Sequence, residues 1–182
     1  GYALESLPLE PIPPGRNVLV AGPTFGGARE LALRLMADER DDDEGTVIVT
    51  TDSGSDALLS RCRQLGADLD DGRVGLVDCA GSEPDADRLR PARVLTVSSP
   101  GDFTGIGMRY SKLCAELRAD GVDRLRTGFH SLSTLLSFGD LRRTSRFVHT
   151  VAGRNAAIDG LGVLLVDPAI HDDRTLGTVA NF

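Results

Sequence analysis

The sequence has no tryptophan, only three cysteines and no long apolar run, and these shortages exclude several classes of protein. Cys62, Cys79 and Cys114 are odd in number, far apart and outside any CxxC arrangement, so they predict neither a disulfide framework nor a zinc site. No stretch approaches the roughly 20 apolar residues that cross a membrane, and the N-terminus lacks the basic-then-apolar order of a signal peptide. We therefore expect a cytoplasmic protein with no membrane contact.

Lysine is also scarce, because Lys112 stands beside 19 arginines, while 20 of the 27 acidic residues are aspartate. The net charge is −7. An Asp-rich, Lys-poor composition is typical of halophilic proteins from salt-loving archaea, in which a strongly hydrated acidic surface maintains solubility. The same balance argues against binding of nucleic acid, because no Lys/Arg-rich stripe with aromatic residues stands out.

Apolar, β-rich runs alternate with longer segments of helical period along the chain. This alternation predicts an α/β fold with a mostly parallel central sheet flanked by helices, in a single domain over residues 1–182. Several runs are continuously apolar, as in strands that are buried on both faces. The expected strands are 17–21, 46–50, 74–79, 94–98, 125–130 and 162–166. The expected helices are 27–39, 55–65, 106–119, 140–158 and 173–180.

Local signals mark the ends of several elements. Residues 1–15 form an extended segment before the first strand, because consecutive prolines forbid a helix there. Asp140 and the Ser55–Asp56 pair are expected N-caps, and Gly66 and Gly121 are expected to end helices.

An acidic run, DERDDDEG at residues 38–45, lies between the first expected helix and the second strand. It is expected to be a solvated loop rather than a metal site, because runs of like charge are ordinarily exposed.

The segment AGPTFGGAREL, residues 21–31, connects the first expected strand to the first expected helix. A glycine-rich turn in this place forms an anion site, because backbone N–H groups converge and the helix dipole favours negative charge. Gly22, Gly26 and Gly27 have the placement of such a turn.

The residues around the last glycine do not match a phosphate loop. The pattern G-x-x-x-x-G-K-[ST] requires a lysine for the β- and γ-phosphates and a hydroxyl for Mg²⁺. Ala28 and Arg29 stand at these two positions. The loop, with Thr24 in its middle, therefore indicates a weak anion or nucleotide site in which Arg29 supplies the positive charge, or only a tight turn with Arg29 exposed or paired to an acid.

The loop belongs to a wider resemblance, carried by PPGRNVLVAGPTFGGARELALRL at residues 13–35 and TVIVTTDSGSDALLSRCRQLGADL at residues 46–69. HSLSTLL at residues 130–136 and DPAIHDDRTL at residues 167–176 are its more specific segments. Over nearly its whole length the chain resembles a divergent haloarchaeal branch of the RecA-superfamily ATPases, of the KaiC and gas-vesicle regulator kind. The resemblance implies a three-layer RecA-like P-loop fold, and relatives that form rings or filaments with nucleotide between subunits.

The resemblance also implies which functional residues have changed. The family's Walker B strand ends in an Asp that supports Mg²⁺ through water, and His130 stands there. Neutral imidazole is a poor ligand for a hard, oxygen-preferring ion. Active members carry paired Glu residues after the second strand, and Asp52 and Ser53 align with them.

Four positions with separate roles are thus altered together, namely Ala28, Arg29, Ser53 and His130. We expect a catalytically inactive pseudo-ATPase that acts through protein–protein contacts in signalling or regulation, because phosphoryl transfer depends on positioning and charge stabilisation. No catalytic residue, metal ligand or cofactor is expected, and ATP with Mg²⁺ is disfavoured. The expected partner is an unidentified protein or a second copy of the chain.

Three other functions stay open. The chain could sense a nucleotide or a phosphorylated ligand without turnover, through the loop backbone and Arg29. It could be an active ATPase with rearranged residues. A role in DNA repair rests on family analogy alone.

Two further patterns have simpler interpretations. A Gly-x-Gly within residues 98–111 lacks the third glycine of a dinucleotide fingerprint, and indicates a helix start capped by Asp102 or Thr104. His149 and His171 are too far apart in sequence to argue for a metal site, and each is expected to have an ordinary hydrogen-bond partner.

The last expected strand ends at Asp167. This residue lies at the carboxyl edge, where α/β sheets place ligands, and it suits equally well as a cap for the turn that follows. A hydrolase triad of Asp167 with His130 and Ser131 or Ser133 is a weaker hypothesis, because no G-x-S-x-G elbow is present.

Overall fold

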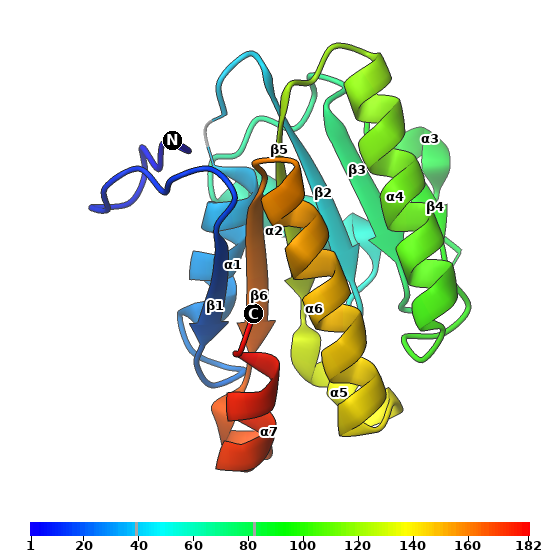
Figure 1. Ribbon diagram of the computed structural model, residues 1–182. Helices are drawn as coiled ribbons and strands as arrows, with labels where there is room; N and C mark the ends of the chain where they lie inside the picture. Colours follow the sequence, from blue (N-terminus) through cyan, green and yellow to red (C-terminus); the bar gives the residue numbers. More distant parts are fainter. Residues whose placement is uncertain (39, 82) are drawn as a thin grey trace.

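The central sheet is built from the apolar runs that the sequence predicts as strands. A computed structural model describes residues 1–38, 40–81 and 83–182. Its strands are β1 (Asn17–Ala21), β2 (Glu44–Thr50), β3 (Val74–Asp78), β4 (Arg93–Thr96), β5 (Arg124–His130) and β6 (Leu161–Val166). All six pair in parallel in the order β1-β6-β5-β2-β3-β4 (Figure 1), and each lies within two residues of its predicted bounds.

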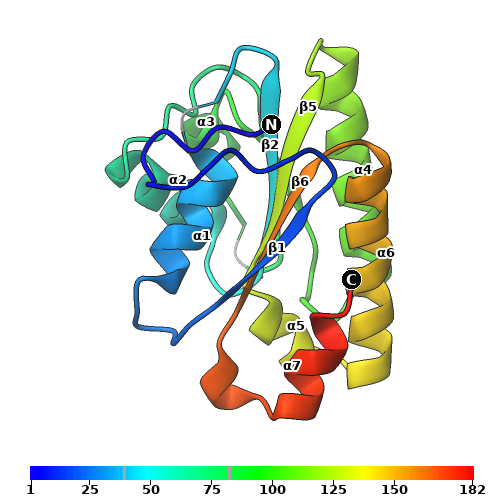
Figure 2. The ribbon, with the colours of Figure 1, turned by 60° about the vertical axis from the view of Figure 1, so that its left-hand side comes forward.

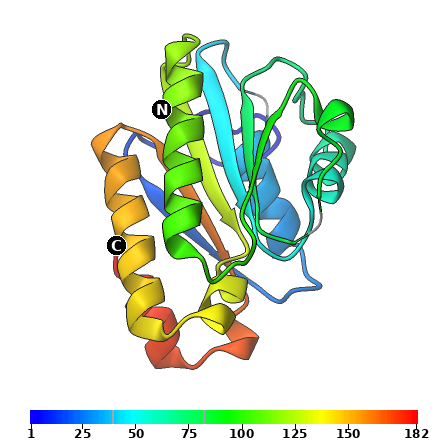
Figure 3. The ribbon, with the colours of Figure 1, turned by 90° about the vertical axis from the view of Figure 1, so that its right-hand side faces the viewer.

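Helices cover both faces of this sheet. They are α1 (Ala28–Ala37), α2 (Ser55–Gln64), α3 (Ala86–Leu89), α4 (Phe103–Ala119), α5 (Leu132–Phe138), α6 (Leu141–Ala157) and α7 (Asp173–Val179), with a 3-10 turn at Pro168–Ile170. α1 and α2 lie on one face, and α4 and α6 lie on the other (Figures 2 and 3). The α/β fold class is therefore confirmed, and the three layers are consistent with a RecA-like arrangement.

The sheet separates two apolar cores. Leu33, Ile48 and Leu59 belong to the core beneath α1 and α2, whereas Ile106 and Phe129 belong to the core beneath α4 and α6. Every residue of β2 is buried, which the apolar run at residues 47–49 predicts for the middle of a central parallel strand. Each fully buried Leu, Ile or Phe side chain of these cores stabilises the fold by about 1.5–3 kcal/mol.

The helix predictions are correct for the long helices and incomplete for the short ones. α4 begins three residues before its predicted start at Ile106. The predicted end of the first helix, Glu39, lies outside the described residues. The sequence does not predict α3, α5 or the 3-10 turn, all of which are shorter than the expected helices.

Most of the predicted helix ends are confirmed. The carboxylates of Asp102 and Asp140 each accept a backbone N–H of the first helical turn at 2.8 Å. Gly66 and Gly121 follow the ends of α2 and α4 with φ values of +91° and +95°, a backbone conformation that favours glycine.

The expected cap of α2 is wrong. The helix begins at Ser55 itself, and its N-cap, Gly54, makes no side-chain bond. The backbone N–H and the hydroxyl of Ser55 both donate to the buried carboxylate of Asp78 at 2.7 Å. An acid at the end of β3 therefore takes the place of a cap from the preceding loop.

The N-terminal segment is extended, as its prolines predict. Tyr2 and Ile12 pair across it in an isolated antiparallel bridge. The Tyr2 side chain is buried, and its hydroxyl donates to the Asp159 carbonyl at 2.9 Å. Figure 2 shows this segment crossing the end of the sheet where β2 begins.

The acidic run at residues 38–45 is only partly a solvated loop. Asp41 and Asp42 are exposed, but Glu44 is fully buried, so the prediction is wrong for this residue. The reason is that β2 begins at Glu44, opposite Arg124 on β5.

Glu44 forms a buried ion pair with Arg126. Both side chains are 0% exposed, and Arg126 Nη2 lies 2.7 Å from Glu44 Oε2. Arg124 Nη2 lies 3.1 Å from Glu44 Oε1, and Arg126 also donates to the Ala3 carbonyl at 2.9 Å. The group thus connects β2, β5 and the N-terminal segment.

None of the helices in the described ranges is both long and apolar enough to cross a membrane.

We predict that Glu44→Gln destabilises the fold by about 3–5 kcal/mol, because it leaves the buried Arg126 cation without a counter-charge. Asp70→Asn is the matched control, since Asp70 pairs with Arg63 at the surface and is 65% exposed. Its effect should stay below about 1 kcal/mol. Denaturant unfolding of the two variants checks this, and equal losses would contradict the assigned role of the buried pair.

Candidate functional site

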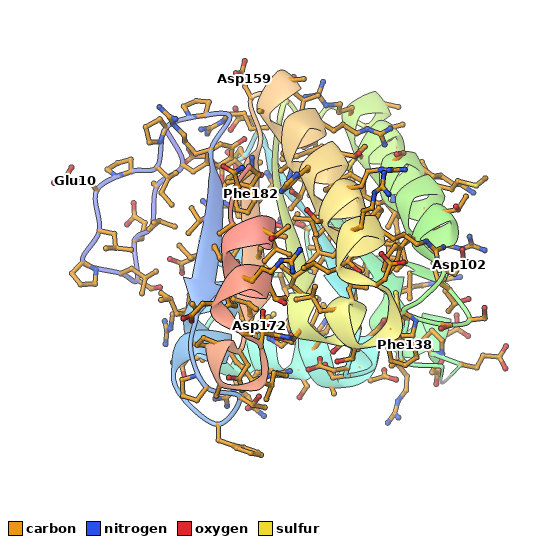
Figure 4. The ribbon with its side chains drawn as sticks, turned by 60° about the horizontal axis from the view of Figure 1, so that its bottom comes forward. Glu10, Asp102, Phe138, Asp159, Asp172 and Phe182 are labelled. Carbon is orange, nitrogen blue, oxygen red and sulfur yellow. The ribbon has the colours of Figure 1, made fainter. Side chains whose placement is uncertain are left out.

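The candidate site lies where the carboxyl ends of β1, β6, β5 and β2 meet. Ala21 pairs with Val166 and Thr50 pairs with His130, so the loops after these strands begin at the same edge of the sheet. Figure 4 turns this edge toward the viewer, with Asp159 at the opposite end of the molecule. The predicted site residues of four separate segments are therefore brought together.

The turn from β1 into α1 has the tight geometry that its glycines predict. A Cβ atom at Gly22 would lie 2.5 Å from the Ala28 Cβ, so only glycine fits there. Gly26 donates its N–H to the Pro23 carbonyl at 2.9 Å. Gly27 is the N-cap of α1, and because glycine has no side chain, no N-cap side chain accepts the free N–H groups of the first helical turn.

Thr24, in the middle of this turn, binds a carboxylate of the protein itself. Its backbone N–H and its hydroxyl donate to Asp167 Oδ2 at 2.8 Å and 2.5 Å. Asp167 Oδ1 accepts the Ala169 N–H at 2.9 Å. These hydrogen bonds hold the pKa of Asp167 below its usual value, and the bond from the Thr24 hydroxyl has the largest effect. Asp167 thus caps its own turn, as one interpretation of the sequence predicts, and also places a negative charge against the loop.

Arg29 is paired with Asp52. Its Nη2 atom lies 2.6 Å from Asp52 Oδ2, and each side chain is 28% exposed. The cation that follows the loop and the acid that follows β2 therefore neutralise each other. The sequence offers pairing of Arg29 with an acid as one interpretation, but it does not identify Asp52, which lies in a different segment.

His130 is buried beside this ion pair. Its side chain is 5% exposed, and its Nδ1 atom lies 3.9 Å from Asp52 Oδ1, too far for a hydrogen bond. Neither ring nitrogen has a hydrogen-bond partner among the described residues. Burial, together with the neighbouring Arg29 cation, lowers the pKa of His130 to about 4. The imidazole is therefore neutral at neutral pH.

A cleft of about 380 Å³ opens between α1 and α2 at this edge. It is lined by Thr24, Phe25, Gly26, Arg29, Glu30, Leu33, Ser53, Ala57, Leu58, Arg61 and His130. Asp52 does not line the cleft itself, but it is paired with Arg29, which does. Three other predicted residues do not line the cleft, namely Gly22, Gly27 and Ala28. They form the tight turn between β1 and α1.

Ser53, which the resemblance aligns with a catalytic Glu, is held by the end of β2. Its backbone carbonyl accepts the Thr50 hydroxyl at 2.6 Å, and its own hydroxyl lies 3.3 Å from the same Thr50 oxygen. The side chain is thus held by the strand that precedes it.

At the positions where the resemblance implies Mg²⁺ ligands, the residues present do not fit the ion. His130 is a neutral imidazole, and Ala28 and Arg29 offer no oxygen ligand. In the described part of the chain, no group of three or more His, Cys, Asp or Glu side chains could hold a metal ion.

The hydrolase triad is arranged differently from its prediction. His130 makes no hydrogen bond to Ser131 or Ser133, because neither of its ring nitrogens has a partner. Ser133 Oγ instead lies 2.9 Å from His171 Nε2 and accepts the Asp167 N–H at 2.9 Å. Ser133 is buried, so this group connects α5 to the segment after β6 and does not present a nucleophile.

Both remaining histidines have the ordinary partners that the sequence predicts. His171 contacts Ser133, and His149 Nε2 lies 3.1 Å from the Thr178 carbonyl oxygen.

Comparison with known proteins gives a family but no function. Residues 15–182 match the model of a protein family described as a family of unknown function, DUF7504. No curated protein matches the chain.

We predict that the protein becomes less stable as the pH falls, because His130 is buried in its neutral form. An unfolded histidine has a pKa of about 6.5, so the unfolded chain takes up a proton before the folded chain does. The His130 contribution is complete above about pH 6.5 and is lost as the pH falls toward 4, by about 2–4 kcal/mol. The unfolding free energy of the wild type and of His130→Gln, measured by denaturant titration from pH 7 to pH 4, gives this difference. Parallel curves for the two proteins would contradict the prediction.

Proposed function

The chain belongs to the DUF7504 family of unknown function, and we propose that it is a catalytically inactive RecA-like domain that acts through protein–protein contacts in regulation or signalling. The observation that supports this most directly is the ion pair between Arg29 and Asp52. These are the only charged side chains at positions where the resemblance to KaiC-like ATPases implies catalytic groups, and they neutralise each other.

The loop offers little to a triphosphate. Ala28 brings a methyl group where a lysine would contact the β- and γ-phosphates. A phosphate chain would have to displace Asp52 from Arg29, and it would meet the Asp167 carboxylate already bound to Thr24. The first step loses an existing ion pair, and the second brings like charges together, which repel strongly where solvent is partly excluded.

The groups that would act on an attacking water are also missing. Asp52 forms a short ion pair with Arg29. The next residue, Ser53, has no carboxylate, and its backbone carbonyl accepts the Thr50 hydroxyl. His130 is neutral and buried, and it is a poor ligand for Mg²⁺. Phosphoryl transfer depends almost wholly on positioning and charge stabilisation, so these changes together favour an inactive domain.

One observation favours a second function, a sensor that binds an anionic ligand without turnover. His130 lines the cleft together with Arg29, and its two buried ring nitrogens have no hydrogen-bond partner in the described part of the chain. A ligand that accepted a hydrogen bond from Arg29 and engaged the imidazole would satisfy both groups without a metal ion.

Calorimetric titration with ATP, with and without Mg²⁺ in high-salt buffer, tests the proposal. We expect the wild type to show neither micromolar binding nor release of inorganic phosphate. Ala28→Lys combined with Arg29→Thr should gain Mg-dependent binding, because it adds the missing cation and hydroxyl. Micromolar Mg-ATP binding with phosphate release by the wild type would refute the inactive assignment.

The sensor predicts a different result in the same experiment. Binding of ATP would persist in EDTA and disappear in Arg29→Ala. Arg34→Ala is the matched control, because it removes an arginine of the same helix that pairs with Glu30 instead.

A further inference from the structure

One face of the molecule carries arginines without acidic partners. Arg142, Arg143, Arg146 and Arg154 lie on α6, which contains no Asp or Glu, and Arg174 lies on α7. In the described ranges, none of these five side chains has a carboxylate within 4.0 Å. On a chain of net charge −7, four arginines on one helix that has no acid are locally distinct, whereas Arg174 has Asp172 and Asp173 beside it at the start of α7.

The opposite face provides the contrast. Arg29 and Arg34 on α1, and Arg61 and Arg63 on α2, each lie within ion-pair distance of a carboxylate. The arginines of α1 and α2 thus meet acids of the chain itself, whereas those of α6 and α7 are available to acids of another molecule.

The surface is also hollowed. A groove of about 730 Å³ runs between α4 and α6, which lie side by side in Figure 3, and a second hollow of about 780 Å³ lies between α6 and α7. Arg146 and Thr150 line both hollows, so they stand on the part of α6 that lies between the two. Arg142 and Arg174 line the second hollow, and Arg143 and Arg154 line the first.

The floor of the first groove is apolar. The rings of Phe103 and Phe147 stack with their centroids 5.1 Å apart, and Met108 is 66% exposed at its side. Arg143 lies over the Phe103 ring at 4.9 Å from its centroid. A cationic rim thus surrounds an apolar floor, which is the surface that an amphipathic segment with acidic residues complements.

We propose that this α4–α6–α7 groove docks an acidic peptide segment of a partner protein, with apolar side chains on Met108 and Phe147 and carboxylates against Arg142 and Arg146. The inference rests on the proposed function, because it names the chemistry of the partner through which an inactive domain would act. The groove and the cleft between α1 and α2 share no lining residue, so each can be tested without the other.

A nucleic acid fits the groove less well than an acidic peptide. Phe103 is buried, and its ring is covered by Phe147 and Arg143, so it offers no free face for a base to stack on. The net charge of −7 repels a long polyanion at a distance, whereas a short peptide meets only the positive surface.

Fluorescence anisotropy with a labelled peptide of repeated Asp-Leu-Glu-Phe units tests the proposal. The wild type should bind this probe, and the double variant Arg142→Glu, Arg146→Glu should bind it at least about tenfold more weakly, a loss of about 1.4 kcal/mol. Arg63→Glu with Arg88→Glu is the matched control, with the same change of net charge on exposed residues elsewhere. It should bind the probe almost as tightly as the wild type, with circular dichroism checking that every variant is folded.

Two further arms separate the contributions and the occupants. A peptide with Ser in place of Leu and Phe, and the variant Met108→Ser, should each weaken binding if the apolar floor takes part. The proposal is overturned if the wild type does not bind the probe, if both charge-reversal pairs weaken binding equally, or if a single-stranded uridine oligonucleotide binds more tightly than the peptide at the same salt concentration. None of these outcomes depends on whether the chain binds Mg-ATP.

Discussion

Parallel pairing fixes the height at which each strand of the sheet ends, and the candidate site depends on this register. Because Thr50 lies opposite His130 and Ala21 opposite Val166, the segments that carry Arg29, Asp52 and Asp167 converge at one edge. A shift of any of these strands by one residue would turn its side chains to the other face and separate the charges. The buried Glu44–Arg126 pair helps to hold the same register of β2 against β5 from the opposite end.

The charged groups at this edge of the sheet bind other groups of the same chain. Arg29 faces Asp52, and Thr24 faces Asp167, so the loop and the cation after it contact protein carboxylates. An ATPase site of this geometry would leave such groups for phosphate and metal. We interpret the edge as one in which internal acids occupy the positions that ligand charges would otherwise take, and we place the interaction with a partner on the α4–α6–α7 groove.

The sequence predicts most of the fold and little of the site's pairing. Continuous apolar runs locate β1 through β6, and Asp102 and Asp140 mark helix starts, because these signals are local. The sequence does not predict α5, whose seven residues follow β5 directly and carry no acidic residue in the first turn. The Arg29–Asp52 pair, the Thr24–Asp167 bonds and the arginines gathered on α6 and α7 depend on which segments become neighbours. Glu44 looks solvated within an acidic run and is buried only because β5 supplies Arg126.

The central claim is that the Arg29–Asp52 pair occupies the place of phosphate and metal chemistry. A crystal structure of the wild type grown with a saturating non-hydrolysable ATP analogue and Mg²⁺ tests it most directly. The account predicts that Arg29 stays within ion-pair distance of Asp52, with Thr24 on Asp167, and that no triphosphate lies on the loop. A triphosphate held by the backbone of residues 22–27, with Arg29 turned from Asp52 to the phosphates and Mg²⁺ beside them, would contradict it.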